Sequence, residues 1–271
     1  MSRMFSEHVN RFVLVYMDDI IIYSKTAEEH LQHLKVVLQI LRDNGFYCKK
    51  SKCQFALPAM LYLGHIISEQ GIAVDGAKTS VVAKWPTPGF KLDLQRFLGL
   101  TNYFRKFIPR YAEMVSLLTD LTRKSVEWRW SAKAQLAFER VKRALVQPPI
   151  LAFPDPDKKY QVVTDASGIG IAAVLLQDGK AIAYESRKLS PAERNYTTTE
   201  QELLAVVHAL RVWQCYLEGA QFEVVTDHCP NTYLPTQPNL SRRQTRWSEF
   251  LQRFGKFDWT YKPGKTNLLI L

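Results

Sequence analysis

The stretch YQVVTDASGIGIAAVLLQ, residues 160–177, decides the fold of the C-terminal half of the chain. Its two apolar runs predict strands at Tyr160–Thr164 and Ile169–Gln177, and the turn Asp178-Gly179 predicts a hairpin to a third strand at Lys180–Ser186. A helix, a strand, a helix and a last strand are predicted at Thr199–Leu217, Phe222–Thr226, Arg242–Phe254 and Phe257–Tyr261. This order predicts an α/β (α+β) domain, a mixed sheet flanked by helices.

Three acidic residues lie where this sheet would present functional groups. Asp165 closes the first strand, Asp227 closes the fourth and precedes His228, and Glu202 lies in the first turns of the long helix. The carboxyl ends of strands share an edge, and three carboxylates there repel one another without a cation. Mg²⁺ or Mn²⁺ fits such a site, and two ions can straddle a phosphodiester. Alternatively, each acid is ordinary: a turn residue, a helix N-cap and a solvent-facing glutamate.

A second acidic pair interrupts the stretch FVLVYMDDIIIYS, Phe12–Ser24. Asp18 and Asp19 stand between two apolar runs that predict a buried strand–turn–strand unit. Burying an ionised carboxylate without a counter-charge is unfavourable. We therefore expect a cation beside this pair as well.

The remaining segments read as short strands and helices. A helix is predicted at Ala27–Asp43, with Leu31, Leu34, Val37, Leu38 and Leu41 on one face and Gly45 ending it. Short strands are predicted at Phe46–Cys48, Gln54–Ala56, Tyr62–Ile67 and Ile72–Val74. Further helices are predicted at Leu92–Phe107, from Pro109, and at Ala132–Leu145 with Ser131 as N-cap, before a proline-rich linker at residues 147–158.

Composition narrows the class of protein. The 271 residues suffice for two modest domains. With 36 Lys and Arg against 26 Asp and Glu, the net charge of +10 favours a polyanionic partner such as nucleic acid, although a merely basic soluble protein has the same balance. Membrane-length apolar runs, a signal peptide and a disulfide framework are absent from the sequence, so we expect an intracellular location, in a cytoplasmic particle or the nucleus.

Several motifs together resemble one family. FVLVYMDDIIIYS resembles the central motif of reverse transcriptases, and YLGHIISEQGI resembles the segment after it. KWPTP and LQRFLGLTNYFRKFIPRYA resemble the thumb-side connection of gypsy-class long-terminal-repeat retrotransposons. YQVVTDASGIGIAAVLLQ, NYTTTEQELLAVVHAL, FEVVTDH and SRRQTRWSEFLQRFGKFDWTYKPGKTN resemble the ribonuclease H domain of the same polyproteins. The resemblance implies a partial palm at residues 1–75, a helical thumb or connection at 76–150 and a ribonuclease H-like domain at 151–271.

The resemblance also implies roles for individual residues. Asp18 and Asp19 match two of three polymerase metal ligands, whereas Asp165, Glu202 and Asp227 match ribonuclease H metal ligands. Tyr16 and Met17 match positions near template and primer, and Gly64 matches the hairpin that grips the primer. Apart from the resemblance, the charge of Arg243 and Arg246 could guide an RNA–DNA hybrid, although these residues could equally cap and solubilise their helix. The implied partners are an RNA–DNA hybrid, template RNA with a DNA primer, and a second copy or the rest of the polyprotein.

Two departures from the family pattern shape the expected activity. The third polymerase aspartate would lie upstream, but none of the seventeen residues before Asp18 is Asp. A fourth ribonuclease H acid would fall near Ile270. We therefore expect an incomplete polymerase site and retained Mg²⁺-dependent hydrolysis of RNA in RNA–DNA hybrids. The alternative is a catalytically decayed remnant that only binds nucleic acid.

Overall fold

The structure is a computed structural model that describes residues 3–9, 11–227 and 240–263. The chain forms two compact units, Met1–Leu57 and Pro58–Leu271, which are described separately. The predicted division into three domains at residues 75 and 150 remains a prediction. Among the described residues, every helix is too short or too polar to cross a membrane.

The first unit is a hairpin packed against one helix. Strands β1 (Val13–Tyr16) and β2 (Asp19–Ile22) pair antiparallel, and α1 (Ala27–Asp43) begins where the Thr26 side chain accepts a hydrogen bond from the Glu29 N–H. Phe5, Val13, Val37 and Leu41 form the core of the unit. The predicted apolar face of α1 is only partly buried, because Leu31 and Leu38 face solvent.

Two short strands predicted in this unit do not form. Residues 46–48 and 54–56 are irregular, and the 3₁₀ turn η1 (Lys50–Lys52) lies between them. The side chain of Tyr47 is 97% exposed, and Phe46 and Phe55 are exposed too. These apolar side chains therefore do not pack on a sheet. The two strand predictions were wrong because apolar character over only three residues does not identify a strand.

The second unit begins with a three-stranded antiparallel sheet. Its strands are β3 (Ala59–Tyr62), β4 (His65–Ser68) and β5 (Gly71–Val74). The single strand predicted at Tyr62–Ile67 is wrong because a two-residue turn divides it. Leu63 and Gly64 have φ values of 48° and 75°, as a type I′ hairpin requires.

Helices follow and share one aromatic core that includes Phe97, Phe107 and Phe138. They are α2 (Gly76–Ala83), α3 (Lys91–Tyr103), the 3₁₀ turn η2 (Arg105–Phe107), α4 (Tyr111–Met114), α5 (Ser116–Leu121) and α6 (Ala132–Val146). The predicted Ser131 cap of α6 is confirmed. Pro109 does not begin a helix; α4 starts after Arg110, whose backbone is left-handed.

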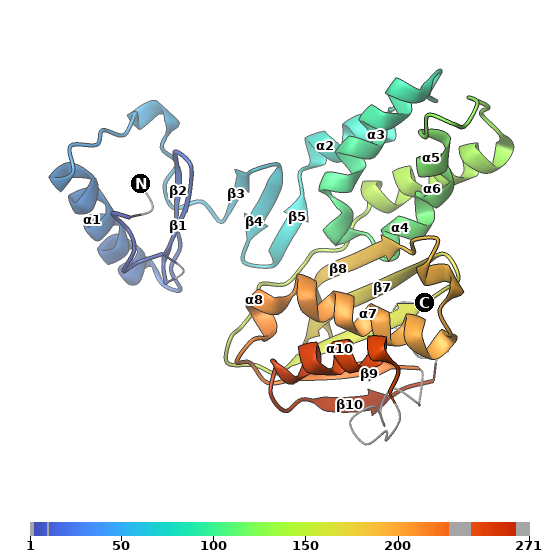
Figure 1. The fold of residues 1–271 in the computed structure, drawn as a ribbon. Helices are drawn as coiled ribbons and strands as arrows, with labels where there is room; N and C mark the ends of the chain where they lie inside the picture. The colour runs from blue at the N-terminus through green and yellow to red at the C-terminus, as the bar shows by residue number, and fades with distance from the viewer. Residues whose placement is uncertain (1–2, 10, 228–239, 264–271) are drawn as a thin grey trace. The chain divides into compact units, whose positions relative to one another are not determined.

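The C-terminal part of this unit is a five-stranded mixed sheet (Figure 1). Its strands are β6 (Tyr160–Ala166), β7 (Gly170–Gln177), β8 (Lys180–Lys188), β9 (Phe222–Thr226) and β10 (Asp258–Tyr261), in the spatial order β10-β9-β6-β7-β8. Strand β6 is parallel to β9 and antiparallel to β7, and β9 is parallel to β10. The predicted mixed α/β class and the turn at Asp178-Gly179 are confirmed.

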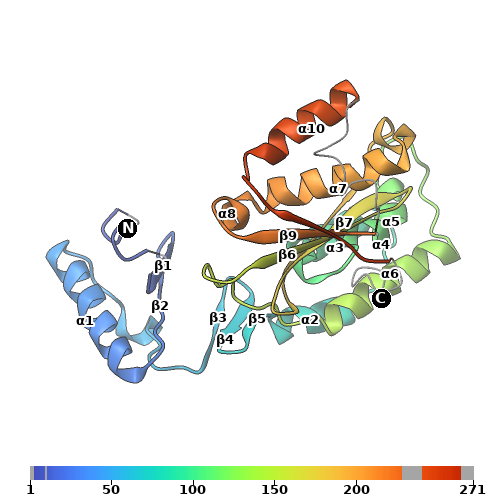
Figure 2. The same cartoon turned by 90° about the horizontal axis from the view of Figure 1, so that it is seen from below.

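Helices cover both faces of the five-stranded sheet. After the 3₁₀ turn η3 (Glu193–Asn195), the helices are α7 (Thr198–Val212), α8 (Gln214–Leu217) and α10 (Arg242–Gln252), so the single helix predicted at Thr199–Leu217 is interrupted at Trp213. Figure 2 shows α7 and α10 on one side of the sheet, where they share an apolar core. On the other side, the Ala112 N–H at the start of α4 donates to the Ser186 hydroxyl of β8.

Replacing Gly71 by Ala is expected to destabilise the protein by at least about 1 kcal/mol. Gly71 has a φ of +129°, and a Cβ there would lie 2.2 Å from the carbonyl oxygen of Leu151. That carbonyl accepts from Ile72 N–H, so the backbone cannot easily retreat. Urea unfolding measures the effect. The control is Gly99→Ala on the exposed face of α3, where a Cβ meets nothing and stability should rise by up to about 1 kcal/mol. Equal effects of the two variants would contradict the prediction.

Candidate metal centre and nucleic-acid interface

The sheet and one helix bring three predicted site residues together. Strands β6 and β9 run parallel with Val163 opposite Val225, and continuing this register by two residues places Asp165 opposite Asp227. Helix α7 packs on β6 and buries Glu202 at the same edge. One ligand oxygen from each of the three carboxylates lies within 4.8 Å of the others.

Burial makes this cluster electrostatically unfavourable without a cation. Asp165 and Glu202 are each only 5% exposed. Burial, followed by the neighbouring charges of Asp165 and Asp227, raises the pKa of Glu202 to about 8. Burial also raises the pKa of Asp165 to about 6, against the opposing effect of Arg110. The pKa values of both buried carboxylates are therefore raised even though Arg110 lies beside Asp165.

The oxygen atoms of Glu202 show where a cation would fit. Oε1 accepts a hydrogen bond from the Ala166 N–H at 3.3 Å, whereas the buried Oε2 has no hydrogen-bond partner within the described part of the chain. Carboxylate oxygens are the ligands that Mg²⁺ and Mn²⁺ prefer. An unpaired buried oxygen beside two further carboxylates therefore fits a divalent cation.

The alternative of three ordinary acids fails for two of them. Glu202 does not face solvent, and Asp165 lies inside β6 rather than in a turn. Glu200, two residues before Glu202, is the ordinary one: it forms a capping box with Thr197. His228, which follows Asp227, and Ile270 lie outside the described residues.

Sequence patterns missed a basic and an acidic residue beside the cluster. Arg110 Nη2 lies 2.9 Å from Asp165 Oδ2, and the same guanidinium contacts both carboxylate oxygens of Glu113. The Ser167 hydroxyl donates to Glu113 Oε1 at 2.8 Å. Arg110 and Glu113 precede Asp165 by about fifty residues, so local spacing carries no signal for this contact.

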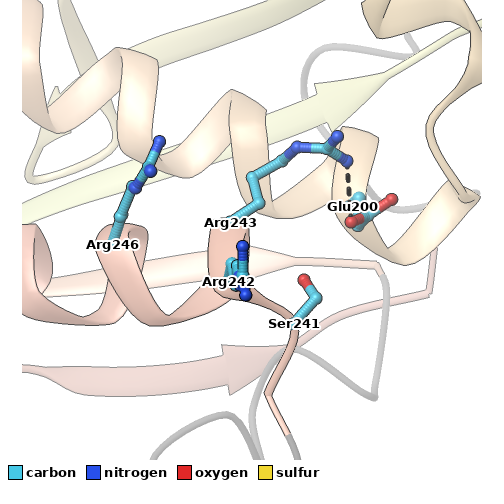
Figure 3. A pocket seen from close by; sticks show the side chains of 5 residues that line it. All are labelled: Glu200, Ser241, Arg242, Arg243 and Arg246. Carbon is cyan, nitrogen blue, oxygen red and sulfur yellow. Dashed lines mark hydrogen bonds and ion pairs between the residues drawn. The ribbon is translucent and has the colours of Figure 1, made fainter.

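A pocket of about 350 Å³ lies at the start of α10, near the beginning of α7. Ser241, Arg242, Arg243, Arg246 and Glu200 line it, and Figure 3 shows Arg243 paired with Glu200. The Arg243 Nη1–Glu200 Oε1 distance is 2.9 Å, and the guanidinium also stacks 3.6 Å above the ring of Tyr196. Arg242 and Arg246 are exposed, so this surface offers positive charge to an anionic ligand.

The other acidic pair, Asp18 and Asp19, lies in the first unit and is not buried as the sequence predicted. Asp18 stands in the turn and Asp19 opens β2, and both side chains are exposed rather than buried. Tyr16 and Met17 are also exposed, at 48% and 76%, and Met17 has a φ of 51°. The tip of the hairpin projects all four side chains into solvent. The carboxylates of Asp18 and Asp19 therefore need no buried counter-ion.

Gly64, the remaining predicted site residue, occupies the β3–β4 turn. The Tyr103 hydroxyl from α3 donates to the carbonyl of neighbouring Leu63 at 2.7 Å. His65 follows the turn and stacks on the ring of Tyr103. The helical region thus supports the backbone of this turn, and a role of Gly64 in gripping a primer stays a prediction.

Comparison with protein families identifies two regions. Residues 1–67 match the family "Reverse transcriptase (RNA-dependent DNA polymerase)", and residues 155–254 match the "RNase H-like domain found in reverse transcriptase". The Tf2-3 and Tf2-4 transposon polyproteins of Schizosaccharomyces pombe are 37% identical over 265 residues, which is 94% of this chain. The chain spans only 20% of the length of those polyproteins.

Solved structures share the fold. The foamy viral protease-reverse transcriptase in complex with an RNA/DNA hybrid matches 98% of this chain with a TM-score of 0.82 and 24% identity, over 38% of its own chain. Another structure of the foamy viral protein, in complex with double-stranded DNA, matches 96% of this chain with the same TM-score and identity, over 47% of its own. At this identity the likeness concerns the fold alone, and it agrees with the mixed class predicted from the sequence.

Replacing Glu202 by Gln is expected to stabilise the metal-free protein at pH 8.5 and to have little effect at pH 5. Folding raises the pKa of Glu202 to about 8, so the folded state holds a proton that the unfolded state releases. The stability from this group is greatest below its ordinary pKa and is lost as pH rises through 8. Glutamine stays neutral and avoids that loss.

Urea unfolding in a chelator at both pH values measures the difference. Glu200→Gln is the matched control in the same helix, and it should destabilise at both pH values because it weakens the Arg243 ion pair. A Glu202→Gln variant that is less stable than the original chain at pH 8.5 would contradict the pKa argument.

Proposed function

We propose a nuclease function for this chain, which belongs to the reverse transcriptase and ribonuclease H family of gypsy-class retrotransposon polyproteins. Asp165, Glu202 and Asp227 form the active site, and its reaction is hydrolysis of the RNA strand of an RNA–DNA hybrid. The observation that carries the proposal is the buried carboxylate cluster with the unpaired oxygen of Glu202. Mg²⁺ is the proposed cofactor, and Mn²⁺ is an alternative of the same ligand preference.

We assign the three carboxylates different roles according to how deeply each is buried. Asp165 and Glu202, both buried, hold their oxygens in fixed positions at the floor of the site. Asp227, which is partly exposed, forms the side open to a phosphate group. Bound divalent cations supply charge neutralisation and polarise the water and the phosphate oxygens. The protein contributes a preorganised acidic edge on a rigid sheet, so little rearrangement is needed for the reaction.

The arginine-lined pocket is proposed to hold the nucleic-acid backbone. Arg242, Arg243 and Arg246 provide fork-shaped donors that match phosphate oxygens. The ion pair between Arg243 and Glu200 ties this surface to α7, the helix that carries Glu202. Because Glu200, which lines the pocket, lies two residues before Glu202 in α7, we propose that a backbone bound there passes near the carboxylate edge. The foamy viral relative of this fold was solved with an RNA/DNA hybrid, which supports a hybrid as the ligand.

The exposed hairpin in the first unit is proposed to serve polymerisation in a longer polyprotein. Asp18 and Asp19 project from the tip of β1–β2 within the region that matches the reverse transcriptase family. Exposure suits residues that take up a cation together with an incoming nucleotide. Tyr16, Met17 and Gly64 are the proposed contacts to template RNA and DNA primer. The rest of the polyprotein or a second copy would complete this site, in a cytoplasmic particle or the nucleus.

Replacing Asp165 by Asn is expected to reduce hybrid cleavage at least about 100-fold, because the amide keeps the shape but removes a charged ligand. The assay uses an end-labelled RNA–DNA hybrid with Mg²⁺, with the same RNA paired to RNA as a substrate control. Asp18→Asn, in the other acidic pair, should leave cleavage unchanged. Equal cleavage by the original chain and Asp165→Asn would refute the nuclease proposal.

Replacing Arg246 by Ala is expected to weaken hybrid binding and to lower the slope of log affinity against log salt by about 1, because one phosphate contact is lost. Fluorescence anisotropy at several salt concentrations in a chelator measures both quantities. Arg253→Ala, beyond the other end of α10, removes the same charge away from the pocket and should have a smaller effect. Equal salt slopes for the two variants would argue against the pocket as the backbone site.

A further inference from the structure

We propose that Arg110 is a built-in counter-cation of the carboxylate cluster and that it lowers the affinity of this site for divalent cations. The inference rests on the proposed metal-dependent function and concerns its regulation. Arg110 comes from the helical region before the sheet, outside the residues that match the ribonuclease H-like family. It is a positioning residue, since it contacts a carboxylate ligand and not the substrate.

The contacts of Arg110 fix its charge against one ligand. Its Nη2 atom lies 2.9 Å from Asp165 Oδ2, and both groups are largely buried. Its Nε donates to Glu113 Oε2 at 3.1 Å, and Nη2 lies 3.1 Å from Glu113 Oε1. Glu113 in turn accepts from the hydroxyl of Ser167, two residues after Asp165. The series of contacts Asp165–Arg110–Glu113–Ser167 therefore starts in β6 and returns to the residue that directly follows this strand.

The backbone around Arg110 is held as firmly as the side chain. Arg110 adopts the left-handed conformation, with a φ of 51°, immediately before α4. This conformation is uncommon for a residue with a side chain, and it persists where the surroundings enforce it. The Ala112 N–H donates to Ser186 Oγ at 2.9 Å, and Lys188 Nζ contacts Asp120 Oδ2 at 2.7 Å. These bonds anchor α4 and α5 to β8, so the guanidinium is delivered to the cluster in a fixed position.

Charge decides what this contact does. A fixed positive charge that contacts one ligand repels a divalent cation bound to the same ligands. It also supplies, in the metal-free state, part of the neutralisation that the buried carboxylates need. Removal of Arg110 would leave Asp165, Glu202, Asp227 and Glu113 near one another without that positive charge. The cluster would then bind a divalent cation more tightly.

This arrangement makes the helical region part of the nuclease site. Asp165 and Ser167 come from the sheet domain, whereas Arg110 and Glu113 come from α4 and the residue before it. Docking of α4 on β8 thus sets the charge of the acidic edge. A site that binds its cation weakly in the free enzyme would depend on the phosphates of a bound hybrid for full occupancy.

The test compares Mn²⁺ binding by the full chain and by Arg110→Met, using isothermal titration at pH 7.5. Methionine keeps an unbranched apolar stem and removes the charge. We expect the dissociation constant of the variant to fall about tenfold, and Arg110→Lys, which keeps the charge but loses the planar fork that binds Glu113, to lower it less than Arg110→Met does. Arg105→Met is the matched control: it removes an arginine that pairs with Glu185 on the same sheet, away from the cluster, and should leave Mn²⁺ affinity unchanged.

Unchanged or weaker Mn²⁺ binding by Arg110→Met would overturn the proposal, because a merely supporting residue weakens the site when removed. If that variant does not fold, Arg110→Gln decides. It removes the positive charge and keeps an N–H donor for Glu113, so tighter Mn²⁺ binding supports the proposal and unchanged or weaker binding overturns it. Asp165→Asn distinguishes failure of this inference from failure of the proposed function. If Asp165→Asn binds Mn²⁺ as tightly as the original chain does, the proposed nuclease site itself is refuted.

Discussion

Repulsion among three carboxylates at one edge of the sheet is the constraint on which the rest of the C-terminal structure depends. The parallel register of β6 and β9 sets Asp165 opposite Asp227, and the packing of α7 adds Glu202. Water cannot screen the two buried members. The protein tolerates this arrangement because a guanidinium, a backbone N–H and the proposed divalent cations share the negative charge.

The helical region and the mixed sheet both contribute residues that offset this repulsion. Helices α4 and α5 are bonded to β8, and the residue before α4 delivers the positive charge that contacts Asp165. The arginine-lined pocket lies at the start of α10, on the side of the sheet opposite to α4, and is tied to α7 through Glu200. One structural unit thus combines the acidic edge, which we propose binds metal, with a basic surface.

Much of the architecture was predictable where the local pattern was long. The apolar strands β6, β7 and β9, the Asp178-Gly179 hairpin and the Ser131-capped helix α6 follow from runs of five or more residues or from specific turn and cap chemistry. The errors fell on short segments. Residues 46–48 and 54–56 are apolar yet solvent-exposed, and Leu63-Gly64 form a turn inside a stretch that reads as one strand.

The sequence by itself determined the family, the sheet and the identity of three acidic residues at strand ends and a helix start, because these features depend on motifs and on local alternation of side chains. Only the tertiary structure decided which charges meet. It placed Asp18 and Asp19 in solvent, buried Glu202 and brought Arg110 to Asp165. Charged groups interact according to their distance in space. A contact between residues more than fifty positions apart therefore cannot be predicted from the local sequence.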